Sequence, residues 1–153
     1  MIYQLRRNQF LHANIDDVWN FASSPKNLQK ITPKEMNFTI TSKPLPGKMY
    51  PGMMITYKVS PLLNIRTTWV TEITQVEEKK YFVDEQRVGP YVMWHHEHFF
   101  DQLEDGVMMR DIITYKLPFH LLGSVVHSLF VKRKLESIFD FRVKKMDEIF
   151  NQK

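Results

Sequence analysis

Two histidines and two aspartates have the types and spacing best suited to chemistry inside a folded domain. His96 and His98 are two residues apart in an aromatic-rich segment, and Asp84 and Asp111 lie in the segments before and after it. Imidazole and carboxylate groups transfer protons near neutral pH and bind polar ligand groups. Burying them is costly unless they are paired with one another, so we expect the four side chains to pair.

The sequence leaves three interpretations of these four residues open. They form a polar network that fixes the register of a sheet, an anchor for the polar end of a ligand, or a general acid–base set. The first two are favoured equally over catalysis. His96 and His98 on one strand face, with Asp111 as a third ligand, also match the spacing of a metal site.

Composition excludes several other function classes. The chain has 153 residues and no cysteine, which excludes disulfides, thiolate zinc sites and a cysteine nucleophile. It has neither a Gly-x-Ser-x-Gly motif nor a phosphate-binding loop. The net charge of +4 is dispersed, and the largest basic cluster is 132–134, so we expect no nucleic-acid partner. A signal peptide and a membrane-spanning apolar run are both absent, which predicts a cytoplasmic protein without integral membrane association.

Hydrophobic periodicity predicts the elements that position these residues. Asn14 and Ser24-Pro25 begin two short helices, because both sites have capping or helix-starting residues. Alternating apolar and polar residues predict strands, and a spacing of three and four after Gly123-Ser124 predicts one long helix. The predicted strands are 2–11, 38–41, 53–60, 65–73, 81–88, 91–103 and 107–117.

This order predicts a single α+β domain over residues 1–153. Short connections imply an antiparallel meander of about seven strands. The long amphipathic helix must bury its apolar stripe against one face of that sheet. A strongly curved sheet that wraps around this helix leaves space between them, because one helix cannot fill the whole concavity. We therefore predict a mostly apolar small-molecule pocket.

Strand parity sorts the candidate residues onto two faces. Trp94, His96 and His98 are predicted to face inward, whereas Tyr91, Met93 and His95 face outward. The same reasoning gives the full set of candidate ligand-binding residues: Tyr57, Trp69, Asp84, Gln86, Trp94, His96, His98, Met109, Asp111 and Tyr115. A bulge in any strand would exchange the two faces beyond it.

The element order resembles the helix-grip fold of the SRPBCC superfamily, which includes START domains, birch-pollen-allergen-like proteins and polyketide cyclase/dehydrase-like proteins. A bacterial ligand-binding subgroup is similar over four stretches: Phe82-Val83-Asp84-Glu85-Gln86, Gly89-Pro90-Tyr91, Trp94 to His98, and Asp111 to Tyr115 with Leu117-Pro118-Phe119. Members of that subgroup, most of them uncharacterised, are sometimes linked to NAD-dependent epimerase-like domains. This chain has no Gly-rich dinucleotide fingerprint, so any epimerase-like partner would be a separate protein.

The resemblance implies a protein that binds a hydrophobic or amphipathic small molecule, such as a lipid, an isoprenoid or a polyketide-like compound. Two alternatives remain open: a cyclase/dehydratase-like acid–base enzyme that uses the pocket histidines and aspartates, and a non-catalytic accessory domain that partners an epimerase-like protein. We expect a binding protein more than an enzyme, in a monomer or weak dimer. We expect no cofactor and no metal, because superfamily members rarely bind metal without a Rieske-type partner domain.

Overall fold

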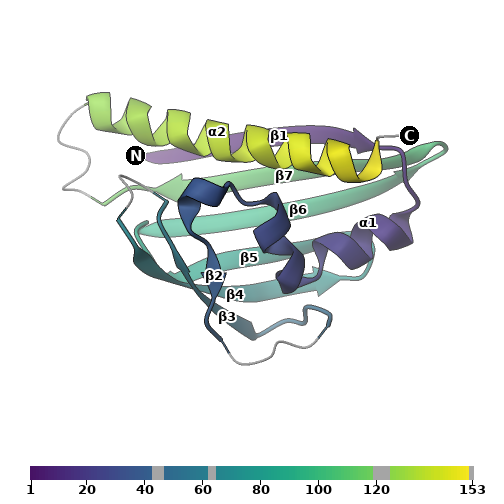
Figure 1. Ribbon diagram of the computed structural model, residues 1–153, viewed down its shortest axis with the longest axis horizontal. Coiled ribbons are helices and arrows are strands. Elements are labelled where there is room, and N and C mark those ends of the chain that lie inside the picture. The colour runs from purple at the N-terminus through teal and green to yellow at the C-terminus, as the bar shows by residue number, and fades with distance from the viewer. Residues whose placement is uncertain (43–46, 62–64, 119–124, 152–153) are drawn as a thin grey trace.

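The computed structural model describes residues 1–42, 47–61, 65–118 and 125–151, which form one sheet and a set of helices (Figure 1). In chain order the elements are β1 (Ile2–Leu11), α1 (Ile15–Ala22), η1 (Pro25–Ile31), η2 (Lys34–Met36), β2 (Thr39–Ile40), β3 (Met53–Val59), β4 (Thr67–Glu77), β5 (Tyr81–Val88), β6 (Met93–Leu103), β7 (Gly106–Lys116) and α2 (Val125–Phe150). The elements η1 and η2 are 3₁₀ helices.

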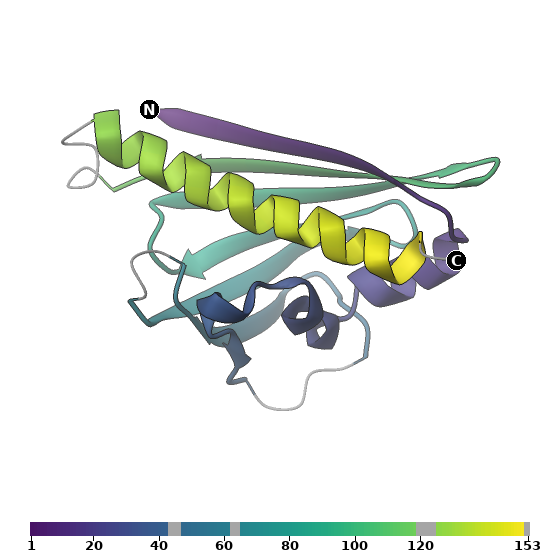
Figure 2. The ribbon, with the colours of Figure 1, turned by 45° about the horizontal axis from the view of Figure 1, so that its top comes forward.

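The sheet has seven strands in the order β1-β7-β6-β5-β4-β3-β2, and every neighbouring pair is antiparallel. Strands β2 to β7 form a meander, and β1 closes one edge by pairing with β7. Figures 1 and 2 show α2 lying along the concave face, with α1 and the two 3₁₀ helices beside it on that face. The predicted α+β helix-grip architecture is confirmed.

The short helices begin where the sequence predicts. Asn14 caps α1, because its Oδ1 accepts a hydrogen bond of 2.8 Å from the backbone N–H of Asp17. Pro25 starts the second helix, which is 3₁₀ in geometry. Beyond the predicted stop at Pro33, one further 3₁₀ turn ends at Asn37, whose φ of 47° is left-handed. These turns bring Leu28 and Met36 against the hydrophobic core.

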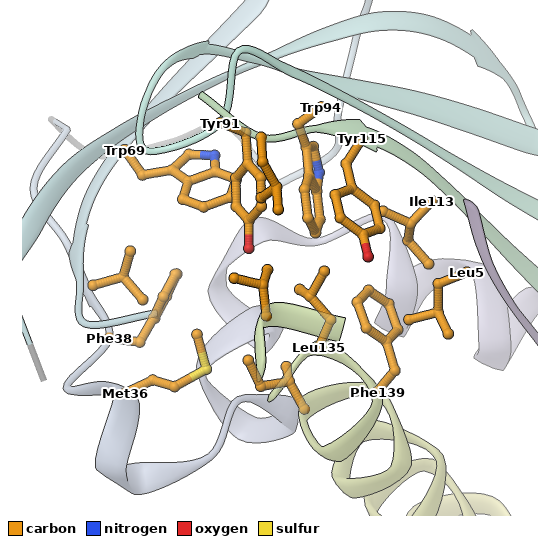
Figure 3. Close-up of a cluster of buried hydrophobic side chains, with 14 residues drawn as sticks. Leu5, Met36, Phe38, Trp69, Tyr91, Trp94, Ile113, Tyr115, Leu135 and Phe139 are labelled. Atoms are coloured by element: carbon orange, nitrogen blue, oxygen red, sulfur yellow. The ribbon is translucent and has the colours of Figure 1, made fainter. Parts of the chain in front are cut away.

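The hydrophobic core lies between the concave face and α2 (Figure 3). Trp94 and Ile113 from the sheet face Leu135 and Phe139 from α2, and all four are buried. The predicted stripe of α2 packs inward at Val131, Leu135, Ile138, Phe139 and Met146, whereas Ile149 near its end is exposed. The apolar residues at helical spacing therefore fix which side of α2 faces the sheet.

Two predicted connections fall partly outside the described residues. They are the proline- and glycine-rich loop over residues 44–52 and the turn over residues 61–64. Within the described part of the chain, no helix combines the length and the hydropathy needed to span a bilayer.

Candidate functional site

A cavity of about 140 Å³ lies between the concave face of the sheet and the helices that cover it. Most of its lining side chains are apolar or aromatic, and they come from β3 to β7, η1, η2 and α2. Examples are Leu28, Met36, Ile55, Trp69 and Ile138. The polar groups that reach this lining include Asp84, His96, His98 and Arg142. An apolar cavity with a few convergent polar groups is the usual form of a small-molecule site.

Strand register brings the histidines and aspartates together. On the β5/β6 pair Asp84 lies opposite His96, and on the β6/β7 pair His98 lies opposite Asp111. Alternation sends all four side chains to the concave face. The two imidazole rings lie side by side with centroids 3.7 Å apart. The predicted pairing of the four side chains is confirmed.

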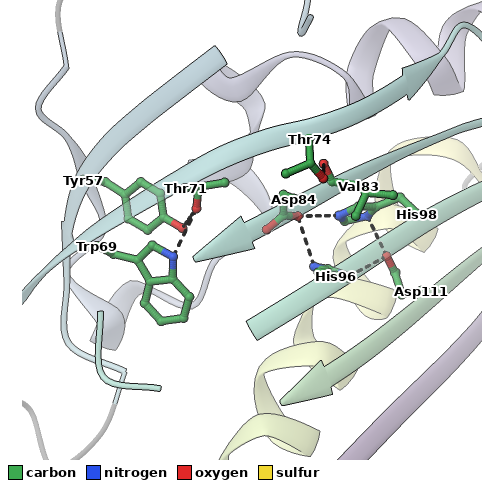
Figure 4. A network of polar contacts seen from close by, with 9 residues as sticks. All are labelled: Tyr57, Trp69, Thr71, Thr74, Val83, Asp84, His96, His98 and Asp111. Atoms are coloured by element: carbon green, nitrogen blue, oxygen red, sulfur yellow. Dashed lines mark hydrogen bonds and ion pairs between the residues drawn. The ribbon is translucent and has the colours of Figure 1, made fainter. Parts of the chain in front are cut away.

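The four side chains close into a ring of contacts, which we call the His–Asp ring (Figure 4). Asp84 Oδ2 lies 2.9 Å from His98 Nε2 and 3.4 Å from His96 Nδ1. Asp111 Oδ1 lies 3.1 Å from His96 Nε2 and 2.8 Å from His98 Nδ1. The contact between His98 Nδ1 and Asp111 is close, but its angles are not those of a hydrogen bond. Each carboxylate therefore bridges both imidazoles.

Both histidines of the ring are buried, and their environment drives the two histidine pKa values apart. The His98 imidazole stacks on Phe82 at 4.0 Å, and His96 meets the edge of Phe139 at 5.4 Å. Burial and then the charge of His98 lower the pKa of His96 from 6.5 to about 4. Burial alone would also lower the pKa of His98, but its close contacts with Asp111 and Asp84 and the charges of both carboxylates outweigh burial and raise it.

Both carboxylates keep their negative charge in this arrangement. Burial opposes ionisation of Asp84 and Asp111, but contacts with the two imidazoles outweigh burial and lower both pKa values. The positive charge of Arg142 on α2 adds to the lowering at Asp84. The lowered pKa values of both aspartates and the opposite shifts of the two histidines favour a ring of two carboxylates in which His98 holds a proton more readily than His96.

Comparison with solved structures identifies the fold around this site. The di-domain ARO/CYC StfQ from the steffimycin biosynthetic pathway matches with a TM-score of 0.73 and 10% identity, over 99% of this chain and 52% of that protein. Protein CV1439 from Chromobacterium violaceum matches with a TM-score of 0.69 and 9% identity, over 99% of both chains. Ara h 8.0201 matches with a TM-score of 0.60 and 11% identity, over 95% of this chain and 98% of that one.

The chain has the SRPBCC, or Bet v1-like, helix-grip fold. No protein-family model and no curated protein matches the sequence. At these identities the likeness to solved structures shows the fold alone.

Within this SRPBCC fold, seven of the ten predicted ligand-binding residues line the cavity: Tyr57, Trp69, Asp84, Trp94, His96, His98 and Met109. The other three lie nearby without lining it. Asp111 is behind the two histidines, Tyr115 stacks on Tyr3 at 5.5 Å, and Gln86 bonds to the backbone of Tyr91. Whether any of the ten binds a ligand stays a prediction.

The outward placement of Tyr91 was wrong. Strand β6 begins at Met93, so Tyr91 lies before the pleat begins, and its ring is buried against Trp94 in the cavity wall. Gln86 holds it there by donating to the Tyr91 carbonyl at 2.7 Å and accepting from its N–H at 3.2 Å. A Cβ at Gly89 would lie 2.3 Å from Gln86 Oε1, which explains glycine in this bend.

Sequence reasoning missed two further polar features of the lining. Thr71 Oγ1 accepts a hydrogen bond of 3.1 Å from Trp69 Nε1 and lies 2.9 Å from the hydroxyl of Tyr57, which orients both rings. Arg142 lies over the ring of Phe139, and its buried Nε has no hydrogen-bond partner among the described residues. Arg142 falls on the apolar stripe of α2, and this break in the pattern was the available signal.

Proposed function

We propose that this protein binds one small hydrophobic or amphipathic molecule in the cavity between the curved sheet and α2. The observation that carries the proposal is the cavity itself, which is mainly apolar and has imidazole, carboxylate and guanidinium groups at one part of its wall. Apolar walls contribute affinity at about 25 cal/mol per Å² of apolar area buried. The polar groups would fix the orientation of the ligand.

The size of the cavity narrows the ligand classes. About 140 Å³ is close to the volume of roughly 150 Å³ that holds benzene in an engineered protein cavity. Pockets for drug-sized molecules are larger, at about 300–1,000 Å³. A single-ring or short-chain compound therefore fits without rearrangement. A long lipid or a multi-ring polyketide would require α2 or η1 to move outward.

The polar wall favours a ligand with an oxygen-bearing end. Arg142 offers a buried guanidinium N–H without a hydrogen-bond partner among the described residues, which suits a carbonyl, phenolate or carboxylate oxygen. Asp84 and His98 come from the sheet, near enough for the charge of Arg142 to act on Asp84, and they suit a hydroxyl group. A small aromatic alcohol or acid meets both requirements. This chemistry is compatible with a biosynthetic role, as StfQ has in the steffimycin biosynthetic pathway.

The test combines ligand extraction with a cavity-filling variant. Protein as expressed is extracted and analysed by mass spectrometry, and phenol, benzoic acid and butanoic acid are titrated by calorimetry. Ile138→Phe adds volume inside the cavity, whereas Leu129→Phe adds the same group to the exposed side of the same helix. We expect ring compounds to bind, with affinity reduced at least tenfold by Ile138→Phe and unchanged by Leu129→Phe. Absence of any retained or titrated compound, or equal effects of the two variants, would contradict the proposal.

A second candidate function is acid–base catalysis of the cyclase or dehydratase type. The observation in its favour is the pair of adjacent imidazoles whose pKa values differ in opposite directions from the ordinary value. Such a pair supplies a neutral base at His96 and a protonated acid at His98 at the same pH. In this case His96→Gln would leave ligand uptake within about threefold and remove turnover of the bound compound. The accessory role beside an epimerase-like protein stays a prediction.

A further inference from the structure

Three donor atoms of the His–Asp ring converge on one point of the cavity wall. Asp84 Oδ2, one nitrogen of His96 and one nitrogen of His98 all lie within 4.8 Å of one another. We propose that these three side chains bind a divalent transition-metal ion of the Zn²⁺ class, with at least one coordination position open to the cavity. This proposal departs from the expectation of no metal that the resemblance to SRPBCC proteins implies.

The position of Asp111 determines which nitrogen of each histidine faces the ion. Asp111 Oδ1 lies 3.1 Å from His96 Nε2 and 2.8 Å from His98 Nδ1. When those nitrogens carry the protons, the lone pairs of His96 Nδ1 and His98 Nε2 point toward the carboxylate of Asp84. Metal-binding histidines generally donate their second N–H to a carboxylate, which fixes the tautomer and the orientation of the ring. Asp111 Oδ1 makes this hydrogen bond with His96 Nε2. It lies 2.8 Å from His98 Nδ1, where a turn of the His98 ring would complete a second one.

The distances suit a small ion after minor adjustment. Zn²⁺ binds nitrogen and carboxylate oxygen at about 2.0–2.2 Å in a tetrahedron, so neighbouring donors stand about 3.4 Å apart. Asp84 Oδ2 lies 3.4 Å from His96 Nδ1 and 2.9 Å from His98 Nε2. Two imidazoles and one carboxylate match the donor set of catalytic zinc sites and of non-haem iron sites, both of which keep open positions.

The four residues of the His–Asp ring differ in whether they reach the cavity. Asp84, His96 and His98 line the cavity, and Asp111 does not. The three donors are thus open to a ligand from the cavity side, while Asp111 supports the histidines from behind. Arg142 reaches the cavity from α2, and the described residues place no carboxylate within 4 Å of it. An oxygen-bearing ligand would therefore meet the ion and a guanidinium together, so this site would also hold the polar end of the molecule in the proposed function.

The test measures metal binding directly and needs no organic ligand. Chelator-treated protein is titrated with Zn²⁺ by calorimetry, and the bound metal is counted by elemental analysis after dialysis. We expect one Zn²⁺ per chain, with Asp84→Asn and His98→Gln each weakening binding at least 100-fold. Asp111→Asn should weaken it 10- to 100-fold, because it orients the donors without touching the ion. His95→Gln is the matched control, because His95 lies on the same strand but faces the opposite side, where it contacts Glu85.

Wild-type protein provides a readout that does not depend on the folding of any variant. With ¹⁵N-labelled histidine, Zn²⁺ should shift the nitrogen resonances of His96 Nδ1 and His98 Nε2 and leave those of His95 unchanged. Failure of Zn²⁺, Co²⁺ and Fe²⁺ to bind at 100 μM, or binding that His95→Gln removes, would overturn the inference. Uptake of phenol by the metal-free protein would leave the proposed function intact even in that case, so the two failures are distinguishable.

Discussion

The two faces of strand β6 carry the same kind of pair in opposite surroundings. On the concave face His96 and His98 contact Asp84 and Asp111 inside the core, and the two rings are 3% and 6% exposed. On the convex face His95 Nδ1 lies 2.9 Å from Glu85 Oε1, and both side chains are about 30% exposed. The distances between histidine nitrogen and carboxylate oxygen are alike on the two faces. The pairs therefore differ mainly in how deeply they are buried.

This difference determines what each pair contributes. An exposed ion pair contributes about 0–1 kcal/mol, because water screens the charges and the side chains lose entropy. Burying a charged group costs several kcal/mol, which the attraction between partners offsets only when the geometry is good and every polar atom is satisfied. The His–Asp ring is therefore costly to assemble and costly to break. Such a ring is weak evidence for a stabilising role and stronger evidence for a role in binding or chemistry.

The largest expected effect comes from breaking the buried ring at one member. Asp111→Ala removes the carboxylate that accepts from His96 Nε2 and lies 2.8 Å from His98 Nδ1, and it leaves two buried imidazoles without that negative charge. We expect the free energy of unfolding to fall by about 3–5 kcal/mol, measured by urea denaturation. Glu85→Ala, on the opposite face of the sheet, should cost below about 1 kcal/mol. Equal losses in the two variants would show that burial does not separate the two faces.

The next effect is on the dependence of stability on pH. The pKa of His96 in the folded protein is about 4 against an ordinary value of 6.5, because burial and the charge of His98 disfavour its protonation. Between these pH values the unfolded chain binds more protons than the folded one. The free energy of unfolding should therefore fall on acidification, by on the order of 3 kcal/mol at pH 4.

Above pH 6.5 the free energy of unfolding should instead fall as the pH rises. The pKa of His98 is raised, so its contribution is fully present below pH 6.5 and is lost as the pH rises through the folded value. Stability of the chelator-treated protein should be greatest near pH 6.5. Urea denaturation across pH 4–9 measures this profile, and His96→Gln should flatten its acidic limb. An unchanged limb in that variant would assign the acid sensitivity to other groups.

A smaller effect is expected when the buried ring is replaced as a whole. Leucine at Asp84, His96, His98 and Asp111 together removes every charge and leaves no partner behind. Replacing a buried ionic cluster by apolar residues is often neutral or stabilising by about 1–4 kcal/mol. We expect an unfolding free energy at least equal to that of the wild type, with Zn²⁺ binding lost. A destabilised leucine variant would indicate that the ring serves the fold more than the site.

The fold was largely predictable because hydrophobic periodicity reports burial directly. Alternation placed Trp94, His96 and His98 on one face, and the structure buries all three. Helical spacing placed Leu135 and Phe139 against the sheet in the same way. These patterns arise from the repeat of the element, and no knowledge of distant neighbours is needed.

The site was less predictable because two of its features depend on contacts distant from the local pattern. Tyr91 enters the cavity because β6 begins two residues later than the alternation suggests, after a bend that Gln86 stabilises. Arg142 comes from another element and meets the sheet only in the folded chain. The division of roles between Asp84 and Asp111 depends on side-chain orientation, which strand parity does not specify.

The smallest expected effect is at the exposed pair of His95 and Glu85 on the convex face. Glu85 also contacts Arg87 at 3.0 Å, so a single substitution would change two interactions at once. A double-mutant cycle with His95→Ala and Glu85→Ala isolates the coupling between those two residues. We expect a coupling below about 1 kcal/mol at pH 6, decreasing further in 1 M salt because the Debye length shortens to about 3 Å. A coupling above 2 kcal/mol would mean that exposure does not weaken this pair, and burial could then no longer explain the difference between the two faces.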